Sequence, residues 1–221
     1  MTKAATDLNL IRHVESDVEQ PLFLGIPEDN EVSDERKIEK IRYHFGCIMK
    51  TLGLDLDDDS LKDTPLRVAR MYVNEIFSGL DPRNYPAISV FDNAYGYDGM
   101  LIEKDIAFYS TCEHHFVPII GRAHVAYIPG NKVIGLSKIN RLVRYFARRP
   151  QVQERLTVEI ANGLKSALQI DDVAVHIEAD HLCVSSRGVQ DTASSTCTSY
   201  FGGKFRDAGV RSEFLSKVRK G

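Results

Sequence analysis

The chain has 221 residues, with 28 Lys and Arg against 31 Asp and Glu, and a formal net charge of -3. This balance argues against a general nucleic-acid binder, whose charge is strongly basic. No apolar run is long enough for a transmembrane helix, and the polar N-terminus does not resemble a secretory signal. Four cysteines in a chain of this length do not make a disulfide scaffold, so we expect a soluble cytoplasmic protein.

The N-terminal part of the chain divides into a polar segment and a helical region. Residues 1–32 are polar and acidic without sustained periodicity, which predicts a flexible segment that carries no chemistry. Residues 33–82 are predicted to be helical, with Ser33 as the first N-cap and Gly53 closing the first helix. Thr64 and Pro65 are predicted to start a second helix, which ends at Gly79. The apolar face predicted for the first helix consists of Ile38, Ile41, Phe45, Ile48 and Leu52.

Residues 83–221 have the pattern of an α+β domain. Segments rich in Ile, Val, Phe and Tyr predict strands at 87–92, 99–110, 115–128 and 132–136. Ser137 is predicted to cap a helix that runs to Arg149, and a second helix is predicted from Val152 to Leu168. Strands at 172–179 and 196–205 and a short helix at 210–219 complete the prediction. Helices followed by strands and hairpins, two helices, two strands and a short tail helix indicate the α+β class.

Two clusters combine cysteine with histidine. The first is Cys-Glu-His-His at residues 112–115, and the second is Asp-His-Leu-Cys at residues 180–183. Together they offer Cys112, His115 and Cys183, a ligand set suited to Zn²⁺. Three protein ligands would leave a position for water, as in catalytic zinc sites, and bound zinc lowers the pKa of that water to about 7. The alternative interpretation is that these residues are packed thiols and surface imidazoles that never meet.

Two further histidines stand beside the proposed ligands. His114 and His181 would be natural proton carriers near a metal-bound water, because an unperturbed imidazole titrates close to neutral pH. The alternative is that both only support the ligands or lie on the surface.

Cations gather at the start of a predicted helix in residues 135–141. Ser137, Lys138 and Arg141 lie where free backbone N–H groups point outward, which indicates a phosphate site, although a solvated basic helix is the alternative. Arg187 and Arg67 are further candidate phosphate ligands, or ordinary surface arginines. Glu154 begins another predicted helix, where it either complements the helix dipole or accepts two N–H bonds from a guanine edge.

Five stretches closely resemble the zinc-dependent GTP cyclohydrolase I family. They are residues 110–115, 134–141, 148–157, 181–183 and 187–190, which occur in the family's order. The resemblance extends from about residue 34 to the C-terminus and does not include the first 30 or so residues.

The resemblance implies a role for each candidate residue. The zinc ligands would be Cys112, His115 and Cys183, and the proton carriers would be His114 and His181. The group near the ribose would be Ser137, and the guanine-anchoring group would be Glu154 with Gln153 beside it. The triphosphate ligands would be Lys138, Arg141 and Arg187, with Arg67 reaching in from a neighbouring subunit.

The resemblance also implies a reaction and an assembly. The family converts GTP to 7,8-dihydroneopterin triphosphate and formate, the first step of pterin and folate biosynthesis, after zinc-activated water attacks C8 of guanine. It has the tunnelling fold, in which ββααββ subunits join their antiparallel sheets and two pentameric rings stack as a decamer. GTP is then the expected substrate and Zn²⁺ the expected cofactor, with no nucleic-acid or membrane partner. Allosteric control remains open.

Two other classes of function compete with this enzyme. One is a zinc-stabilised oligomer that binds nucleotide without turning it over, which would not need both His114 and His181. The other is a different tunnelling-fold enzyme, such as a pterin aldolase or a cysteine-dependent nitrile reductase. Such enzymes lack the Cys/His/Cys trio combined with the Ser-Lys-x-x-Arg helix, so the zinc cyclohydrolase is favoured.

Overall fold

The N-terminal helices follow from their caps and from the spacing of their apolar residues. The computed structural model describes residues 32–219. In α1 (Asp34–Thr51), the Ser33 side chain accepts a hydrogen bond from the Arg36 N–H at 3.4 Å, as the predicted N-cap requires. Gly53, just beyond the helix, has a φ of +82°, a conformation that favours glycine. The first predicted helix is confirmed.

The second predicted helix is shorter and less regular than expected. α2 (Thr64–Met71) has Asp63 rather than Thr64 at its cap position and continues as a π-helical turn, η1 (Tyr72–Ile76). The 3-10 turns η2 (Ser78–Leu80) and η3 (Pro82–Asn84) follow. The prediction of one helix from Thr64 to Gly79 is therefore wrong beyond Met71.

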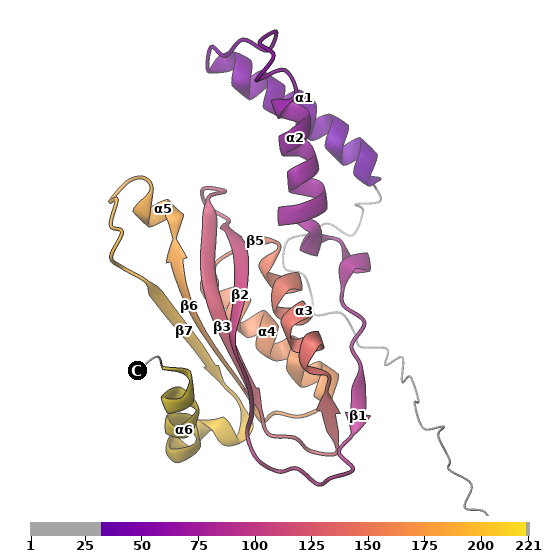
Figure 1. Cartoon of the computed structure of the whole chain (residues 1–221), viewed down its shortest axis with the longest axis vertical. Coiled ribbons are helices and arrows are strands. Elements are labelled where there is room, and N and C mark those ends of the chain that lie inside the picture. The colour runs from indigo at the N-terminus through magenta and orange to yellow at the C-terminus, as the bar shows by residue number, and fades with distance from the viewer. Residues whose placement is uncertain (1–31, 220–221) are drawn as a thin grey trace, which may run out of the picture.

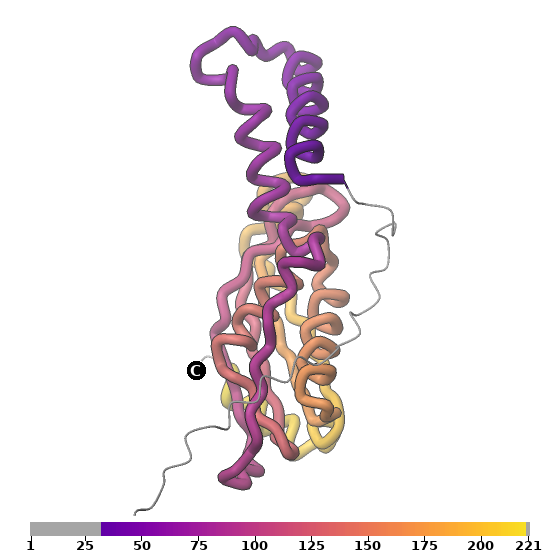
Figure 2. The backbone as a smooth tube through the Cα atoms, turned by 90° about the vertical axis from the view of Figure 1, so that its right-hand side faces the viewer, coloured from indigo at the N-terminus to yellow at the C-terminus, as the bar shows by residue number. Residues whose placement is uncertain are grey.

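α1 and α2 form a hairpin that projects beyond one end of the sheet (Figure 1; Figure 2). The predicted apolar face of α1 is only partly covered: Ile38, Ile41 and Phe45 are half-buried, whereas Ile48 is 53% and Leu52 71% exposed. This partial burial arises because α2 covers one side of α1 while the body of the molecule lies beyond the hairpin.

The central sheet has five strands in the order β5-β2-β3-β6-β7. Its antiparallel strands are β2 (Leu101–Cys112), β3 (Pro118–Tyr127), β6 (Val173–His181) and β7 (Thr196–Phe201). A short strand, β5 (Pro150–Gln151), pairs in parallel with the Cys112 end of β2. A separate pair at the other end joins β1 (Val90–Asp92) to β4 (Lys132–Ile134).

Two helices cover one face of this sheet and form the main core with it (Figure 1). α3 (Leu136–Ala147) buries Ile139, Leu142, Val143 and Phe146, and α4 (Gln153–Leu168) buries Leu156, Ile160 and Leu164. This spacing gives each helix one apolar stripe. Gly163 allows the two helices to approach, since a Cβ there would lie 2.8 Å from Phe146 Cε2.

The opposite face is covered near one end by α6 (Ala208–Val218), which buries Phe214 with Phe205 of the turn η4 (Gly203–Arg206). Along the chain, β2 and β3 come first, α3 and α4 follow, and β6 and β7 come last. This order confirms the α+β class and the ββααββ arrangement. The predicted boundaries at residues 32 and 82 stay predictions, and the segment 1–32 lies outside the described residues except for Val32.

The predicted cap of the third helix is wrong. Gly135 occupies the cap position of α3, and Ser137 lies within its first turn without a side-chain capping bond. The helix starts early because β4 ends at Ile134 and the Lys138 N–H already bonds to the Gly135 carbonyl at 2.8 Å. The hydroxyl of Ser137 is therefore not used to cap the helix.

Candidate active site

Cys112, His115 and Cys183 come together at one end of the sheet. Cys112 is the last residue of β2, and Cys183 lies in α5 (Leu182–Ser185), a helical turn directly after β6. Both strands pair with β3, where Ile119 lies opposite His181, so their ends are brought side by side. The ligand atoms of the three residues all lie within 4.8 Å of one another.

The turn after Cys112 is closed by backbone hydrogen bonds. The Cys112 N–H donates to the Val117 carbonyl at 2.9 Å, and the Phe116 N–H donates to the Cys112 carbonyl at 2.8 Å. This turn brings two imidazoles to the sulfur: Cys112 Sγ lies 3.8 Å from His114 Nδ1 and 3.9 Å from His115 Nδ1.

The donor set fits a zinc ion. Two sulfurs and one imidazole nitrogen are ligands that Zn²⁺ prefers, and three protein ligands leave a coordination position open. Burial and the nearby Cys112 sulfur raise the pKa of the Cys183 thiol, whereas Arg187 acts in the opposite direction. A divalent cation between the two sulfurs would favour the thiolates that bind it.

His114 and His181 differ in their surroundings. The His114 side chain is 64% exposed and lies 3.9 Å from the Glu113 carboxylate. His181 is half-buried, and its Nε2 lies 2.7 Å from Gln153 Oε1. Burial lowers the pKa of His181, while Glu154 and Asp180 oppose that shift. His181 is therefore held by the protein, and His114 faces solvent.

The two residues expected at guanine also differ. Glu154 is exposed in the first turn of α4 and acts electrostatically on His181, so its carboxylate is available to a ligand near that imidazole. The Gln153 side chain is 2% exposed and bonded to protein atoms. Binding of substrate by Gln153 stays a prediction, although its side-chain donors and acceptor are already engaged.

The predicted phosphate residues lie in three different places. Arg187 follows α5 and is close enough to influence Cys183 electrostatically. Arg67 lies in the first turn of α2 on the projecting hairpin, 3.9 Å from Asp63. Lys138 and Arg141 begin α3, at the end of the sheet opposite Cys112 (Figure 1).

The distance to the start of α3 can be estimated along β2. Asn140 Nδ2 donates to Glu103 Oε1 at 3.0 Å, which fixes the start of α3 beside the first residues of β2. At about 3.3 Å per residue, Glu103 and Cys112 are roughly 30 Å apart. The start of α3 is therefore far from the three predicted zinc ligands of the same chain. This part of α3 carries Ser137, Lys138 and Arg141.

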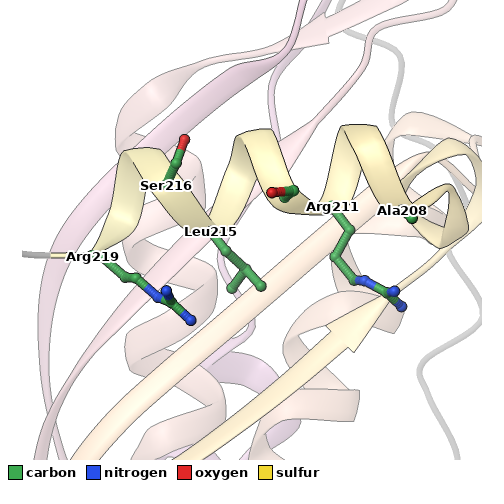
Figure 3. Close-up of a pocket in the computed structure, with 6 residues that line it drawn as sticks. Ala208, Arg211, Leu215, Ser216 and Arg219 are labelled. Carbon is green, nitrogen blue, oxygen red and sulfur yellow. The ribbon is translucent and has the colours of Figure 1, made fainter.

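A hollow elsewhere on the surface holds none of these residues. It runs along α6 and is lined by Ala208, Arg211, Ser212, Leu215, Ser216 and Arg219 (Figure 3). α6 lies at the end of the sheet away from α5 (Figure 1). The convergence at Cys112 therefore remains the candidate active site.

Known proteins that are similar to this chain identify its family. The family model described as GTP cyclohydrolase I matches residues 41–219. This chain belongs to the GTP cyclohydrolase I family. It is 56% identical over 208 residues to a protein of Flavobacterium johnsoniae named GTP cyclohydrolase 1, covering 94% of this chain and 92% of that one.

Other members of the family are nearly as similar. A GTP cyclohydrolase 1 of Aeromonas hydrophila is 55% identical and covers 86% of this chain and 88% of its own length. One of a Shewanella species is 49% identical over 99% of both chains. Among solved structures, the archaeosine synthase QueF-Like in the apo form shares 17% identity with a TM-score of 0.39, covering 46% of this chain and 90% of that one.

Membership of the GTP cyclohydrolase I family establishes that the chain is an enzyme with the tunnelling fold. Within residues 32–219, no helix combines the length and apolar composition that a bilayer crossing requires.

Sequence reasoning missed the residues that support the Cys112 turn. Arg155 reaches from α4 to the Glu113 carboxylate and also donates to the Pro150 carbonyl at 2.9 Å and to Gln151 Oε1 at 2.8 Å. The Glu113 N–H in turn donates to the Gln151 carbonyl at 3.1 Å. No local pattern links residues so far apart in the chain, so only the fold reveals this pair.

This support continues toward the helical region. Gln151 Nε2 donates to Glu159 Oε2 at 2.7 Å, and Glu159 forms a 3.5 Å ion pair with Arg149. Arg149 is buried, and its Nε donates to the Gly79 carbonyl at 2.8 Å. A network of polar contacts therefore connects η2 to the turn that carries the predicted metal ligands.

Proposed function

We propose that this enzyme opens the imidazole ring of GTP at C8 in a zinc-dependent hydrolysis, then forms 7,8-dihydroneopterin triphosphate and releases formate. The observation that carries the proposal is the convergence of Cys112, His115 and Cys183 within 4.8 Å, in a chain of the GTP cyclohydrolase I family. Such a reaction would be the first step of pterin and folate biosynthesis.

Cys112, His115 and Cys183 would hold the zinc. Bound there, zinc supplies a Lewis acid with an open position, which lowers the pKa of a water molecule to about 7. Arg155 would keep Glu113, and with it the turn, in position. His114 and His181 would exchange protons with the reacting groups, because His114 Nδ1 lies 3.8 Å from Cys112 Sγ and His181 directly precedes the helical turn that carries Cys183.

Guanine would be held at the start of α4. The exposed carboxylate of Glu154 can accept two hydrogen bonds from the N–H groups of the guanine edge. Glu154 directly follows Gln153, whose Oε1 lies 2.7 Å from His181 Nε2, so the base would lie near the proposed proton carrier.

The triphosphate would require a second copy of the chain. Within one chain, the start of α3 is roughly 30 Å from the Cys112 cluster, by the spacing of residues along a strand. We infer that Ser137, Lys138 and Arg141 of one copy complete the site of another, while Arg187 is supplied by the chain that carries the zinc ligands. Arg67, on the projecting hairpin, would reach the triphosphate from a further copy.

The unpaired edges of the sheet support such an assembly. β7 is an edge strand, and β5 covers only Thr111 and Cys112 at the end of β2. Exposed edges tend to pair with other strands, and rings close such edges. We propose a homo-oligomer of two stacked pentameric rings, acting in the cytoplasm.

The test is formate release from GTP by the purified full chain, before and after zinc is removed with a chelator and restored. We expect release to stop without metal and to return when zinc is added. A zinc-loaded oligomer that binds GTP but releases no formate would contradict the proposal and favour a nucleotide-binding protein without turnover.

A further inference from the structure

The side chain of Gln153 lies against His181 in the interior of the protein. Its amide group is close to four polar atoms. One is His181 Nε2, 2.7 Å from Gln153 Oε1. The other three surround Gln153 Nε2: Thr196 O at 2.9 Å, Thr198 Oγ1 at 3.1 Å and Ile177 O at 3.3 Å.

The two backbone carbonyls determine the orientation of this amide. Carbonyl oxygens only accept hydrogen bonds, so the group of Gln153 that faces Thr196 O and Ile177 O must be its NH₂. Oε1 is then the atom that faces His181. Because Oε1 also only accepts, His181 Nε2 must carry a proton. The neutral imidazole is therefore the Nε2–H tautomer.

Two threonine hydroxyls agree with this assignment. Thr157 Oγ1 donates its proton to the backbone carbonyl of Gln153 at 2.8 Å. Thr198 Oγ1, 2.7 Å from Thr157 Oγ1, must therefore be the donor in that contact. The lone pairs of Thr198 Oγ1 remain available to accept from Gln153 Nε2. The contacts therefore identify the donor and the acceptor in each pair.

We propose that Gln153 is a positioning residue that fixes His181 as the Nε2–H tautomer and makes Nδ1 the nitrogen that exchanges protons in the reaction. Among the described residues, Nδ1 of His181 has no hydrogen-bond partner, so its lone pair is available.

This role differs from the guanine contact that the family resemblance implies for Gln153. The assignment of the tautomer follows from the contacts alone, whereas the role of Nδ1 rests on the proposed function of His181. The two can be tested separately.

The tautomer can be read by NMR of the full-length protein labelled with ¹⁵N-histidine. Two-bond correlations between the ring nitrogens and the carbon-bound protons distinguish the two neutral tautomers, and His181→Ala identifies the signals of His181. We expect the Nε2–H pattern. An Nδ1–H pattern in the unaltered protein would overturn the proposal, and this measurement needs no variant of Gln153 to fold.

Gln153→Met tests the positioning role, because methionine has a similar length but no amide. We expect the His181 pattern to become averaged or reversed, with the metal content retained. A positioned acid or base typically contributes about 10²- to 10⁴-fold, so partial loss of the correct tautomer should lower kcat by about 10- to 100-fold while the KM for GTP changes less than about 3-fold. A large rise in KM with kcat and tautomer unchanged would overturn the proposal and favour direct binding of guanine.

Thr198→Val is the matched control. It removes one acceptor but leaves Thr196 O and Ile177 O to orient the amide, so the tautomer should persist and kcat should stay within about 3-fold. Loss of the tautomer in this variant would contradict the claim that the Thr196 and Ile177 carbonyls orient the Gln153 amide. If His181→Ala retained full formate release, the proton-transfer role would be wrong, whereas the NMR assignment would stand.

Discussion

The two ends of the sheet carry the two halves of the proposed site, and only one half is complete within a single chain. At the Cys112 end, three ligand atoms lie within 4.8 Å of one another, while Arg155 contacts Glu113 of the adjoining turn and Gln153 contacts His181. At the other end, the first turn of α3 contains Lys138 and no acidic residue. Neighbouring strands can bring metal ligands together within one chain. In the proposed assembly, by contrast, the cations of α3 contact the triphosphate only when it is bound by another copy of the chain.

The largest effect is expected at the Cys112 end. Cys183→Ser should abolish both zinc retention and formate release, because an uncharged hydroxyl is a poor substitute for a thiolate ligand. Metal content by atomic spectroscopy and activity should be measured on the same sample. Cys197→Ser, on the exposed face of β7, is the matched control and should retain both. Full metal and full turnover in Cys183→Ser would contradict the ligand assignment.

Mixing two inactive variants tests whether the metal half and the phosphate half of the site come from different chains. Lys138→Ala damages the phosphate half, and Cys183→Ser damages the metal half. If the halves come from different copies, mixed oligomers regain activity, with about a quarter of the sites receiving two intact halves in an equal random mixture. Formate release by co-expressed, differently tagged chains gives the measurement.

The control for this experiment combines both substitutions in one chain and mixes it with a second copy of the same double variant, which should stay inactive. No recovery in mixed oligomers of confirmed composition would indicate that both halves belong to the same chain.

A smaller effect is expected from the support of the Cys112 turn. Arg155→Met removes the contact with Glu113 and should lower kcat by about 10- to 100-fold, the usual range for residues that orient a metal site. Arg155→Lys should recover part of the loss because one charged contact remains possible. Arg42→Met, an exposed change on α1, is the control. An unchanged kcat in Arg155→Met would show that the turn keeps its geometry without the pair.

The smallest effect concerns stability. His124 is 4% exposed, and burial lowers its pKa below the usual 6.5. The unfolded chain therefore binds more protons than the folded one, so this contribution to stability is present above pH 6.5 and is lost as the pH falls. His124→Asn should reduce the fall in Tm between about pH 7.5 and about pH 5.5 by on the order of 2 °C.

Asparagine can still accept the hydrogen bond that the Asp105 N–H gives to His124 Nδ1 at 3.2 Å. An identical pH dependence in His124→Asn would assign the effect to other groups, including the stacked His176, whose pKa burial also lowers.

Local patterns predicted most elements but not every boundary or contact. The first helix was predictable because Ser33, the apolar spacing and Gly53 act over a few residues. The cap of α3 was not, because the end of β4, rather than the Ser137 hydroxyl, determines where that helix starts. The exposure of Leu52 also depends on where α2 lies, which periodicity does not specify.

The sequence by itself determined the α+β order and the residue types that can bind zinc and exchange protons, because caps, periodicity and ligand chemistry are local properties. Tertiary structure decided which of those residues meet. Pairing of β3 with β2 and β6 joins Cys112 to Cys183, and the length of β2 separates Lys138 from both. It also decided that Gln153 faces His181, since the carbonyls that orient its amide come from strands distant in the sequence.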